Sequence, residues 1–367
     1  MTEALYAKVY DTLRSRIVDG ELAVGDRLPS QTELAGQFSV SVITVKRALD
    51  MLRDDGFVTR RPRIGTVVVS RTPEETVDGE RLPLVGYLAP GFHDAFGSHV
   101  LLGLLAASRH HAHVTLAVTE GDADLEERLI EEQLARGIEG LILLPSSSQA
   151  IPPTVATLLG RRFPIVIVDR TLAGMPVSTV TSDNVAGGRM AAEYLFDRGH
   201  TGIALVLSPN EISSLEERRR GVIAAHAAHQ VRLDPDRIFN DVRSVIPGST
   251  VTAEQDVAEL REFLASRPDI TACVTAEYHS ARLVLRAAQE IGRRVPEELS
   301  IVCFDAPPEF VDAALPFTHV EQDQHTIGRR AFDLLARQLG ERGLVAQETV
   351  PVRIVEGGST GPAPRQG

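Results

Sequence analysis

The spacing of apolar positions predicts three short helices at the start of the chain. One apolar residue in every four marks the first helix, which ends at Gly20: Leu5, Val9, Leu13 and Ile17. Ser30 and Glu33 form a capping-box pattern at the start of a second helix. Ser41 is placed to cap a third helix, which Gly56 ends. The apolar face of this third helix consists of Val45, Ala48, Leu49 and Leu52.

Beyond Gly56 the pattern changes to two short strands. Residues 57–59 and 66–69 are apolar or β-branched, and the segment RRPRIG at 60–65 joins them as a basic hairpin. Three helices followed by such a hairpin predict a winged helix-turn-helix domain over residues 1–70. The alternative is a small helical domain with ordinary caps and surface arginines, because a capping box alone is weak evidence.

Polar side chains of this segment suit a DNA partner. In a helix-turn-helix, the second helix of the motif enters the major groove by its N-terminal end, where this chain has hydroxyl and cationic side chains. Groups at a helix N-terminus can bind phosphate, and hairpin arginines can enter a narrow minor groove. The candidate DNA contacts obtained in this way are Ser30, Ser41, Thr44, Lys46, Arg47, Arg60, Arg61 and Arg63.

Residues 25–70 resemble the GntR-type DNA-binding domain. The resemblance rests on LPS, ELA, the VS-x-x-TV turn, RAL-x-x-L, the DGF step and the GT of the wing, and it adds Thr32 and Gly65 to the candidate DNA contacts. The chain departs from the family at Val42, where an Arg usually follows the VS turn, and at Thr32, where a basic residue is frequent. Because those basic residues typically contact DNA, the resemblance implies that base readout relies on Ser41, Thr44 and Lys46, with help from the wing.

From Leu84 onward, short apolar runs alternate with helical stretches, which predicts an α/β architecture of parallel sheets. The span is too long for one ordinary open sheet, so two lobes are expected. Residues 71–83 are polar and bracketed by prolines, and we expect them to be a linker. Residues 84–357 are then the two-lobed domain, and residues 358–367 are predicted to be a disordered tail.

Charged and amide side chains follow several of the predicted strands. Asp169 ends the run IVIVD, Asp305 ends SIVCFD, and Arg218 lies near the start of a helix. Ligands of open α/β sheets bind outside the carboxyl ends of the strands, and carboxylates with an arginine fork suit the hydroxyls of a sugar. A single Asp after a strand is as often a cap or turn residue, but several at equivalent ends favour a binding site. The predicted effector-binding residues are Phe92, Asp169, Arg218, Glu277, Asp305 and Gln322.

This second region resembles the LacI/GalR-type effector domain, which has the periplasmic-binding-protein fold. The resemblance is carried by TSDNVAGGRMAAEYLFDRGHTGIALV at 181–206, the R-x-x-G that begins at Arg218, and GRRVPEELSIVCFD at 292–305. It implies that Arg218 and Asp305 are the most consistent effector contacts. By the same resemblance, further contacts come from Asp169 and Gln322. Glu277 and Tyr278 replace the Asn-Asp pair that is common at that place.

A GntR-type domain joined to a LacI-type domain is a combination typical of arabinose-repressor-like regulators. It implies a repressor of a carbohydrate-use operon that binds a palindromic operator as a homodimer and is controlled by a small sugar between the lobes. The linker lacks the apolar helical pattern of a LacI-type hinge helix. We therefore expect coupling through the geometry of the dimer.

The charge of the chain changes this picture only when it is divided by segment. The 367 residues have a net charge of −12, which by itself argues against a nucleic-acid partner. Residues 1–70, however, have 10 Lys and Arg against 9 Asp and Glu, so the acidity belongs to the rest of the chain. The charge of the whole chain therefore does not exclude DNA.

Other function classes have weaker support. Cys273 and Cys303 lie in apolar runs and are expected to be buried thiols, and no apolar stretch is long enough for a membrane span, so a cytoplasmic protein is expected. The three histidines at 110–113 lack a matching ligand cluster, and no cofactor loop is present. We expect no metal, no cofactor and no enzymatic activity. The alternative is a cytosolic α/β enzyme or small-molecule-binding protein with an incidental helical N-terminal domain.

Overall fold

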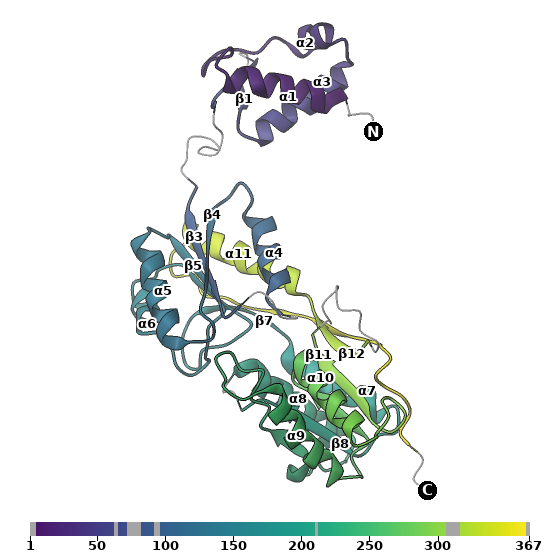
Figure 1. The fold of residues 1–367 in the computed structure, drawn as a ribbon. Helices are drawn as coiled ribbons and strands as arrows, with labels where there is room; N and C mark the ends of the chain where they lie inside the picture. The colour runs from purple at the N-terminus through teal and green to yellow at the C-terminus, as the bar shows by residue number, and fades with distance from the viewer. Residues whose placement is uncertain are drawn as a thin grey trace. The chain divides into compact units, whose positions relative to one another are not determined.

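A computed structural model describes residues 5–61, 65–71, 82–91, 96–209, 212–305 and 316–364. The chain divides into two compact units, Met1–Leu82 and Pro83–Gly367 (Figure 1). We call them the N-terminal unit and the C-terminal unit and describe each by itself.

The N-terminal unit has three helices and a β-hairpin. Its elements are α1 (Leu5–Val18), α2 (Gln31–Phe38), α3 (Val42–Asp54), β1 (Val58–Arg61) and β2 (Gly65–Val68). β1 and β2 pair antiparallel, and Arg27 adds a bridge to Val67. The apolar residues predicted for the first and third helices lie in one buried core, except Leu5, which is 62% exposed. The winged helix-turn-helix is therefore confirmed.

Side-chain caps set where the helices of the motif begin. Ser30 Oγ accepts the backbone N–H of Glu33 at 3.3 Å, and the Glu33 carboxylate accepts the N–H of Ser30 at 2.7 Å, which completes the predicted capping box. Ser41 Oγ accepts the N–H of Thr44 at 3.1 Å at the start of α3. Such a cap contributes about 1 kcal/mol, so polar side chains fix the turn between α2 and α3.

The C-terminal unit has two lobes, each built on a six-stranded sheet. The sheet of the first lobe has the order β13-β7-β6-β5-β3-β4, and that of the second lobe β14-β12-β11-β10-β8-β9. Neighbouring strands are parallel except β12 and β14. The strands are β3 (Leu84–Ala89), β4 (His113–Val118), β5 (Gly140–Leu143), β6 (Ile165–Val168), β7 (Ser178–Ser182), β8 (Ile203–Leu207), β9 (Ile238–Asn240), β10 (Ala272–Thr275), β11 (Ser300–Phe304), β12 (Thr318–Gln322), β13 (Gln347–Val350) and β14 (Val352–Val355).

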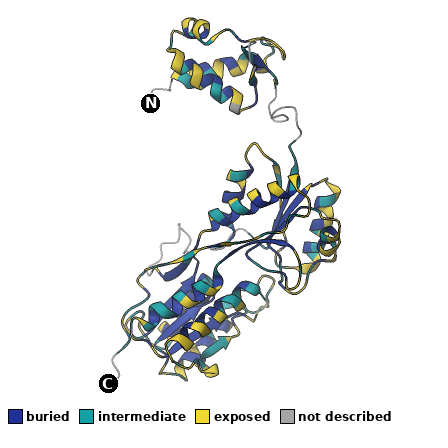
Figure 2. Cartoon of the chain, turned by 180° about the vertical axis from the view of Figure 1, so that it is seen from behind, coloured by how far each residue is buried: buried dark blue, intermediate teal, exposed yellow. Residues whose placement is uncertain are grey.

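Helices cover both faces of each sheet, and the central strands are buried (Figure 2). In the first lobe α4 and α11 pack on one face and α5 and α6 on the other; in the second lobe the pairs are α7 with α8 and α9 with α10. The helices are α4 (Ser98–Ser108), α5 (Ala123–Ala135), α6 (Pro153–Gly160), α7 (Asn184–Phe196), α8 (Ser213–Ala228), the 3-10 turn η2 (Pro235–Arg237), α9 (Ala253–Ala265), α10 (Tyr278–Glu290) and α11 (Gln324–Gly340). The predicted α/β class with two parallel-sheet lobes is confirmed.

Three chain segments connect the lobes. β7 of the first lobe leads into α7 of the second, β12 of the second leads into α11 of the first, and the consecutive strands β13 and β14 belong to different sheets. The ends of β7 and β12 therefore lie where the chain passes between lobes. Asn184 and Gln322 occupy these two places.

The tail prediction is wrong for residues 358–364, which the structure places against the second lobe. Ser359 is fully buried; its hydroxyl donates to the carbonyl of Ile301 at 2.6 Å and accepts the N–H of Thr318 at 2.9 Å. Gly361 N–H donates to Ser300 Oγ at 3.0 Å. This segment satisfies backbone groups at the start of β11 and β12, which its polar composition did not indicate. Residues 365–367 lie outside the described residues.

Glycines bring the backbones of α7 and α8 into contact. A Cβ atom at Gly188 would lie 2.0 Å from the carbonyl oxygen of Arg218, and a Cβ atom at Gly221 would lie 2.1 Å from that of Val185. Gly187 faces the ring of Phe304 in the same way. Gly188 and Gly221 thus set the distance between α7 and α8, while Gly187 allows α7 to lie against Phe304 of β11.

We predict that Gly188→Ala destabilises the protein, because the added methyl group forces α7 and α8 apart. Overpacking of this kind costs about 1–3 kcal/mol, measured as the free energy of unfolding in urea. Gly160→Ala is the matched control: a Cβ there meets nothing within 4 Å in helix α6, so we expect a gain of about 0.4–1 kcal/mol. Equal stabilities of the two variants would contradict the close packing.

Candidate functional site

Four of the ten predicted DNA contacts lie at the start of α3 and on its outward face: Ser41, Thr44, Lys46 and Arg47. Lys46 and Arg47 are exposed, and the Arg47 guanidinium lies over the Tyr6 ring of α1, with its carbon 4.1 Å from the ring centre. Ser41 Oγ and Thr44 Oγ1 lie 2.7 Å apart, so these two hydroxyls form one pair at the start of the helix. The start of α3 therefore has a pair of hydroxyl groups, and two cations follow along the helix.

The remaining predicted contacts of this unit lie at the start of α2 and on the hairpin. Ser30 and Thr32 are exposed at the N-terminus of α2, and Arg60 is exposed on β1. Gly65 has φ +111°, and a Cβ there would lie 3.1 Å from Arg27 Nε, so glycine is required where the hairpin meets Arg27. Arg63 lies outside the described residues, as does the side chain of Arg61.

Two aspartates occupy equivalent places in the two lobes of the C-terminal unit. Asp169 follows β6 and Asp305 follows β11, and both backbones are left-handed, with φ of 64° and 75°. Both side chains are buried, as is Gln322 at the end of β12. An unusual backbone conformation shared by two buried carboxylates suggests that their orientation serves a site.

We call Asp169, Arg218, Asp305 and Gln322 the buried cluster. Arg218 of α8 is its cation, and three groups of the protein hold it in place. Its Nε donates to Asn184 Oδ1 at 2.9 Å, and its Nη1 donates to the carbonyl of Ala276 at 2.5 Å. The guanidinium carbon lies 4.1 Å from the centre of the Phe304 ring, in a cation–π contact. Arg218 is therefore oriented before any ligand binds.

The pKa of the Asp305 carboxyl depends on its burial and on the charged side chains around it. Burial raises the pKa of its carboxyl to about 6, while Arg218 and a hydrogen bond from Gln322 Nε2 lower it and Asp169 and Glu277 raise it further. Among the described residues, Asp169 Oδ1 and Gln322 Oε1 are buried without a hydrogen-bond partner. Unpartnered buried oxygens are costly, so these two atoms are acceptors that the protein itself leaves unused.

The other two predicted effector contacts have different outcomes. The Glu277 carboxylate caps α10: it accepts the N–H groups of His279 and Ser280 at 2.7 and 2.6 Å and also the Ser280 hydroxyl. Phe92 lies outside the described residues. Asn184 was missed by the sequence analysis, although it is the N of the DN-x-x-GG motif that carried the resemblance.

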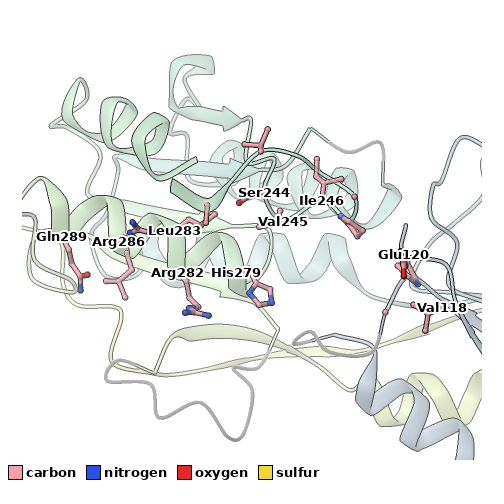
Figure 3. A pocket seen from close by; sticks show the side chains of 17 residues that line it. Val118, Glu120, Ser244, Val245, Ile246, His279, Arg282, Leu283, Arg286 and Gln289 are labelled. Atoms are coloured by element: carbon pink, nitrogen blue, oxygen red, sulfur yellow. The ribbon is translucent and has the colours of Figure 1, made fainter. Parts of the chain in front are cut away.

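A cavity lies between the lobes, beside the cluster. It measures about 930 Å³ and is lined by Gly91 and Glu120 of the first lobe and by residues of the second lobe such as Ile246, His279 and Arg282 (Figure 3). Asp169, Arg218 and Asp305 are not among the residues that line it. The lobes also touch directly: Thr171 N–H donates to Ser213 Oγ at 2.8 Å, and Ser213 N–H donates to Ser148 Oγ at 2.9 Å.

The comparisons with known proteins agree with both units. Residues 5–68 match the bacterial regulatory proteins of the gntR family, and residues 192–360 match the periplasmic binding protein-like domain. The chain is therefore a transcriptional regulator that joins a GntR-type helix-turn-helix to a periplasmic-binding-protein-like domain.

Relatives of the chain are named as regulators. The arabinose metabolism transcriptional repressor of Geobacillus stearothermophilus is 26% identical over 347 residues, 92% of each chain. The HTH-type transcriptional regulator CelR of Thermobifida fusca is 29% identical over 267 residues, 72% of this chain and 74% of that protein. Among solved structures, a complex of the transcriptional regulator CelR with cellobiose has a TM-score of 0.66 and 24% identity, covering 98% of this chain and 100% of that one.

These findings support the regulator and not the alternative of an enzyme, since the relatives are transcriptional regulators. Within the described residues, no group of three or more His, Cys, Asp or Glu side chains could hold a metal ion. None of the helices described has the length and apolar character needed to cross a bilayer.

We predict that Asp305→Asn stabilises the protein at high pH. Burial raises the pKa of Asp305 from the ordinary 3.8 to about 6. Below pH 4 the carboxyl is neutral in both the folded and the unfolded chain, whereas above pH 6 the folded chain must hold a buried charge. The free energy of unfolding therefore falls as the pH rises from about 4 to about 6 and stays lower above it. In urea unfolding, the variant should be more stable than the wild type by about 3 kcal/mol at pH 8 and by only about 1.6 kcal/mol at pH 5.

Asp269→Asn is a control of opposite sign. A hydrogen bond from Arg237 lowers the pKa of the Asp269 carboxyl, so its replacement should destabilise the protein at pH 8. A gap between Asp305→Asn and the wild type that does not change with pH would contradict the raised pKa of Asp305.

Proposed function

We propose that this protein is a repressor of a carbohydrate-use operon, whose affinity for a palindromic operator is controlled by a small sugar. The sugar binds between the lobes, to Asp169, Arg218, Asp305 and Gln322. The observation that carries this proposal is the buried cluster itself, with its oriented guanidinium and its two unpartnered acceptor oxygens. The arabinose repressor among the relatives and the CelR complex with cellobiose support a sugar as the ligand.

The chemistry of the cluster suits adjacent hydroxyl groups. A carboxylate accepts two hydroxyl hydrogens, whereas Arg218 donates in a fork and Gln322 can do both. Glu277 acts on the site indirectly, because its oxygens are used in capping α10 while its charge raises the pKa of Asp305. The apolar face of a sugar ring would pack against an aromatic side chain, and we propose Phe92 for this role.

The N-terminal unit is the operator-binding part. We propose that α3 enters the major groove with Ser41, Thr44, Lys46 and Arg47, and that the hairpin reaches the adjacent groove. The parts are then residues 1–70 as reader, 71–83 as linker and 84–357 as sensor. Because the partner is the operator, the protein would act in the cytoplasm.

The main test measures operator binding and its response to sugar in the same sample. Arg218→Ala should keep the operator affinity of the wild type but lose at least about tenfold in effector affinity, because charged hydrogen bonds to the ligand disappear. Arg220→Ala is the matched control: it is the second residue after Arg218 in α8, exposed and paired with Glu217, and should respond normally. Fluorescence anisotropy of a labelled operator with a sugar panel provides both readouts.

A normal response of Arg218→Ala to the sugar would overturn the assignment of the site. Failure of the wild-type protein to bind any DNA sequence selectively would overturn the repressor itself.

An apolar surface on the first lobe supports the homodimer. Leu102 and Leu105 of α4 are 55% and 40% exposed, and Leu116 and Val118 of the neighbouring strand β4 are 45% and 40% exposed. β4 is an edge strand of its sheet. Exposed apolar side chains gathered on a helix and an edge strand are typical of an interface, so we propose that α4 and β4 meet the partner subunit.

We predict that Leu102→Glu converts the dimer into monomers and weakens operator binding, because a charge would be buried at the interface. Light scattering coupled to size exclusion measures the mass. Val345→Glu introduces the same charge at a residue that is 49% exposed and lies between α11 and β13, and it should remain dimeric. A dimeric Leu102→Glu variant would place the interface elsewhere.

A further inference from the structure

Two apolar side chains are exposed at the first turn of α3. Ile43 is 80% exposed and Val42 is 44% exposed, directly after the N-cap Ser41. The buried face of this helix consists of Val45, Ala48, Leu49 and Leu52. At 100° per residue, Ile43 points almost directly away from that face.

The cations of α3 flank this apolar tip. Lys46 and Arg47 follow Ile43 by three and four residues, so they lie one turn further along the same outward face, and both are exposed. Single exposed apolar residues are common on protein surfaces. Here, however, two adjacent ones occupy the part of the helix that a helix-turn-helix brings to base edges, within a surface whose charge suits phosphate.

We propose that Ile43, with Val42 beside it, reads the 5-methyl group of thymine in the operator. This inference rests on the proposed function and names the base class that the reader recognises. Neither side chain can donate or accept a hydrogen bond, so neither can recognise guanine through its O6 and N7 atoms. In the major groove the one apolar group of a standard base is the thymine methyl, and apolar side chains contact it.

Val42 supports the proposed contact with the thymine methyl group, because an apolar residue stands where an arginine is expected. It occupies the position where the GntR-type resemblance implies an arginine, which could form two hydrogen bonds to guanine. The operator half-site should therefore have an A·T pair with its thymine methyl beneath the first turn of α3. Lys46, for which the resemblance implies base readout, contacts the phosphate backbone instead in this proposal and contributes affinity without sequence preference.

The test starts from an operator selected from random DNA with the full-length protein. Each thymine of the half-site is replaced in turn by deoxyuracil, which lacks only the methyl group. At one or two positions we expect about fourfold weaker binding for each methyl removed. With Ile43→Ala, binding to the thymine operator should be weaker and the loss caused by uracil at that position should disappear.

Two further variants separate base contacts from the general attraction to DNA. Lys46→Ala should weaken binding to thymine and uracil operators equally and reduce the slope of log K against log salt by about 0.9. Val24→Ala removes another exposed side chain of the N-terminal unit, 57% exposed before α2, and should leave the uracil effect intact.

The outcomes distinguish this inference from the proposed function. If a specific operator is selected but uracil has no effect at any position, or if Ile43→Ala keeps the full uracil effect, the methyl contact is overturned and the repressor stands. If no sequence is selected, the proposed function itself fails.

Discussion

The orientation of one buried guanidinium is the constraint on which the sensor depends. Arg218 could not remain buried without partners, and Asn184 Oδ1, the carbonyl of Ala276 and the ring of Phe304 supply them. These partners come from α7 and from the ends of β10 and β11, so the site exists only when α8 lies close to α7. Gly188 permits this approach, which links a packing feature directly to the electrostatics of the cluster.

The same cluster contains residues of both lobes. Asp169 belongs to the first lobe, whereas Arg218 and Asp305 belong to the second, and the charge of Asp169 is felt at Asp305. A ligand that bonds to both lobes binds their closed arrangement more tightly than their open one. The difference between these two binding free energies is the most that the ligand can contribute to a conformational change of the dimer. The hydrogen bonds of Ser213 to the first lobe keep the lobes in contact on one side of the site.

Sequence reasoning succeeded where the signal was local. The capping box at Ser30 and the cap at Ser41 predicted the helix-turn-helix, and the apolar runs before Asp169 and Asp305 predicted that both follow strands. The contribution of Asn184 was missed because it depends on where α8 crosses α7, which no local pattern encodes. Ser359 was assigned to a disordered tail because a polar segment that satisfies the backbone of β11 and β12 has the composition of a free end.

The central claim is that sugar binding and operator binding are coupled through one protein, and calorimetry tests it most directly. The affinity for the sugar is measured by titration with and without saturating operator DNA. Coupling is reciprocal, so the operator must change the affinity for the sugar by the same factor as the sugar changes the affinity for the operator, typically about 5–150-fold. We predict such a change in the wild-type protein. Equal affinities for the sugar with and without operator would contradict the account.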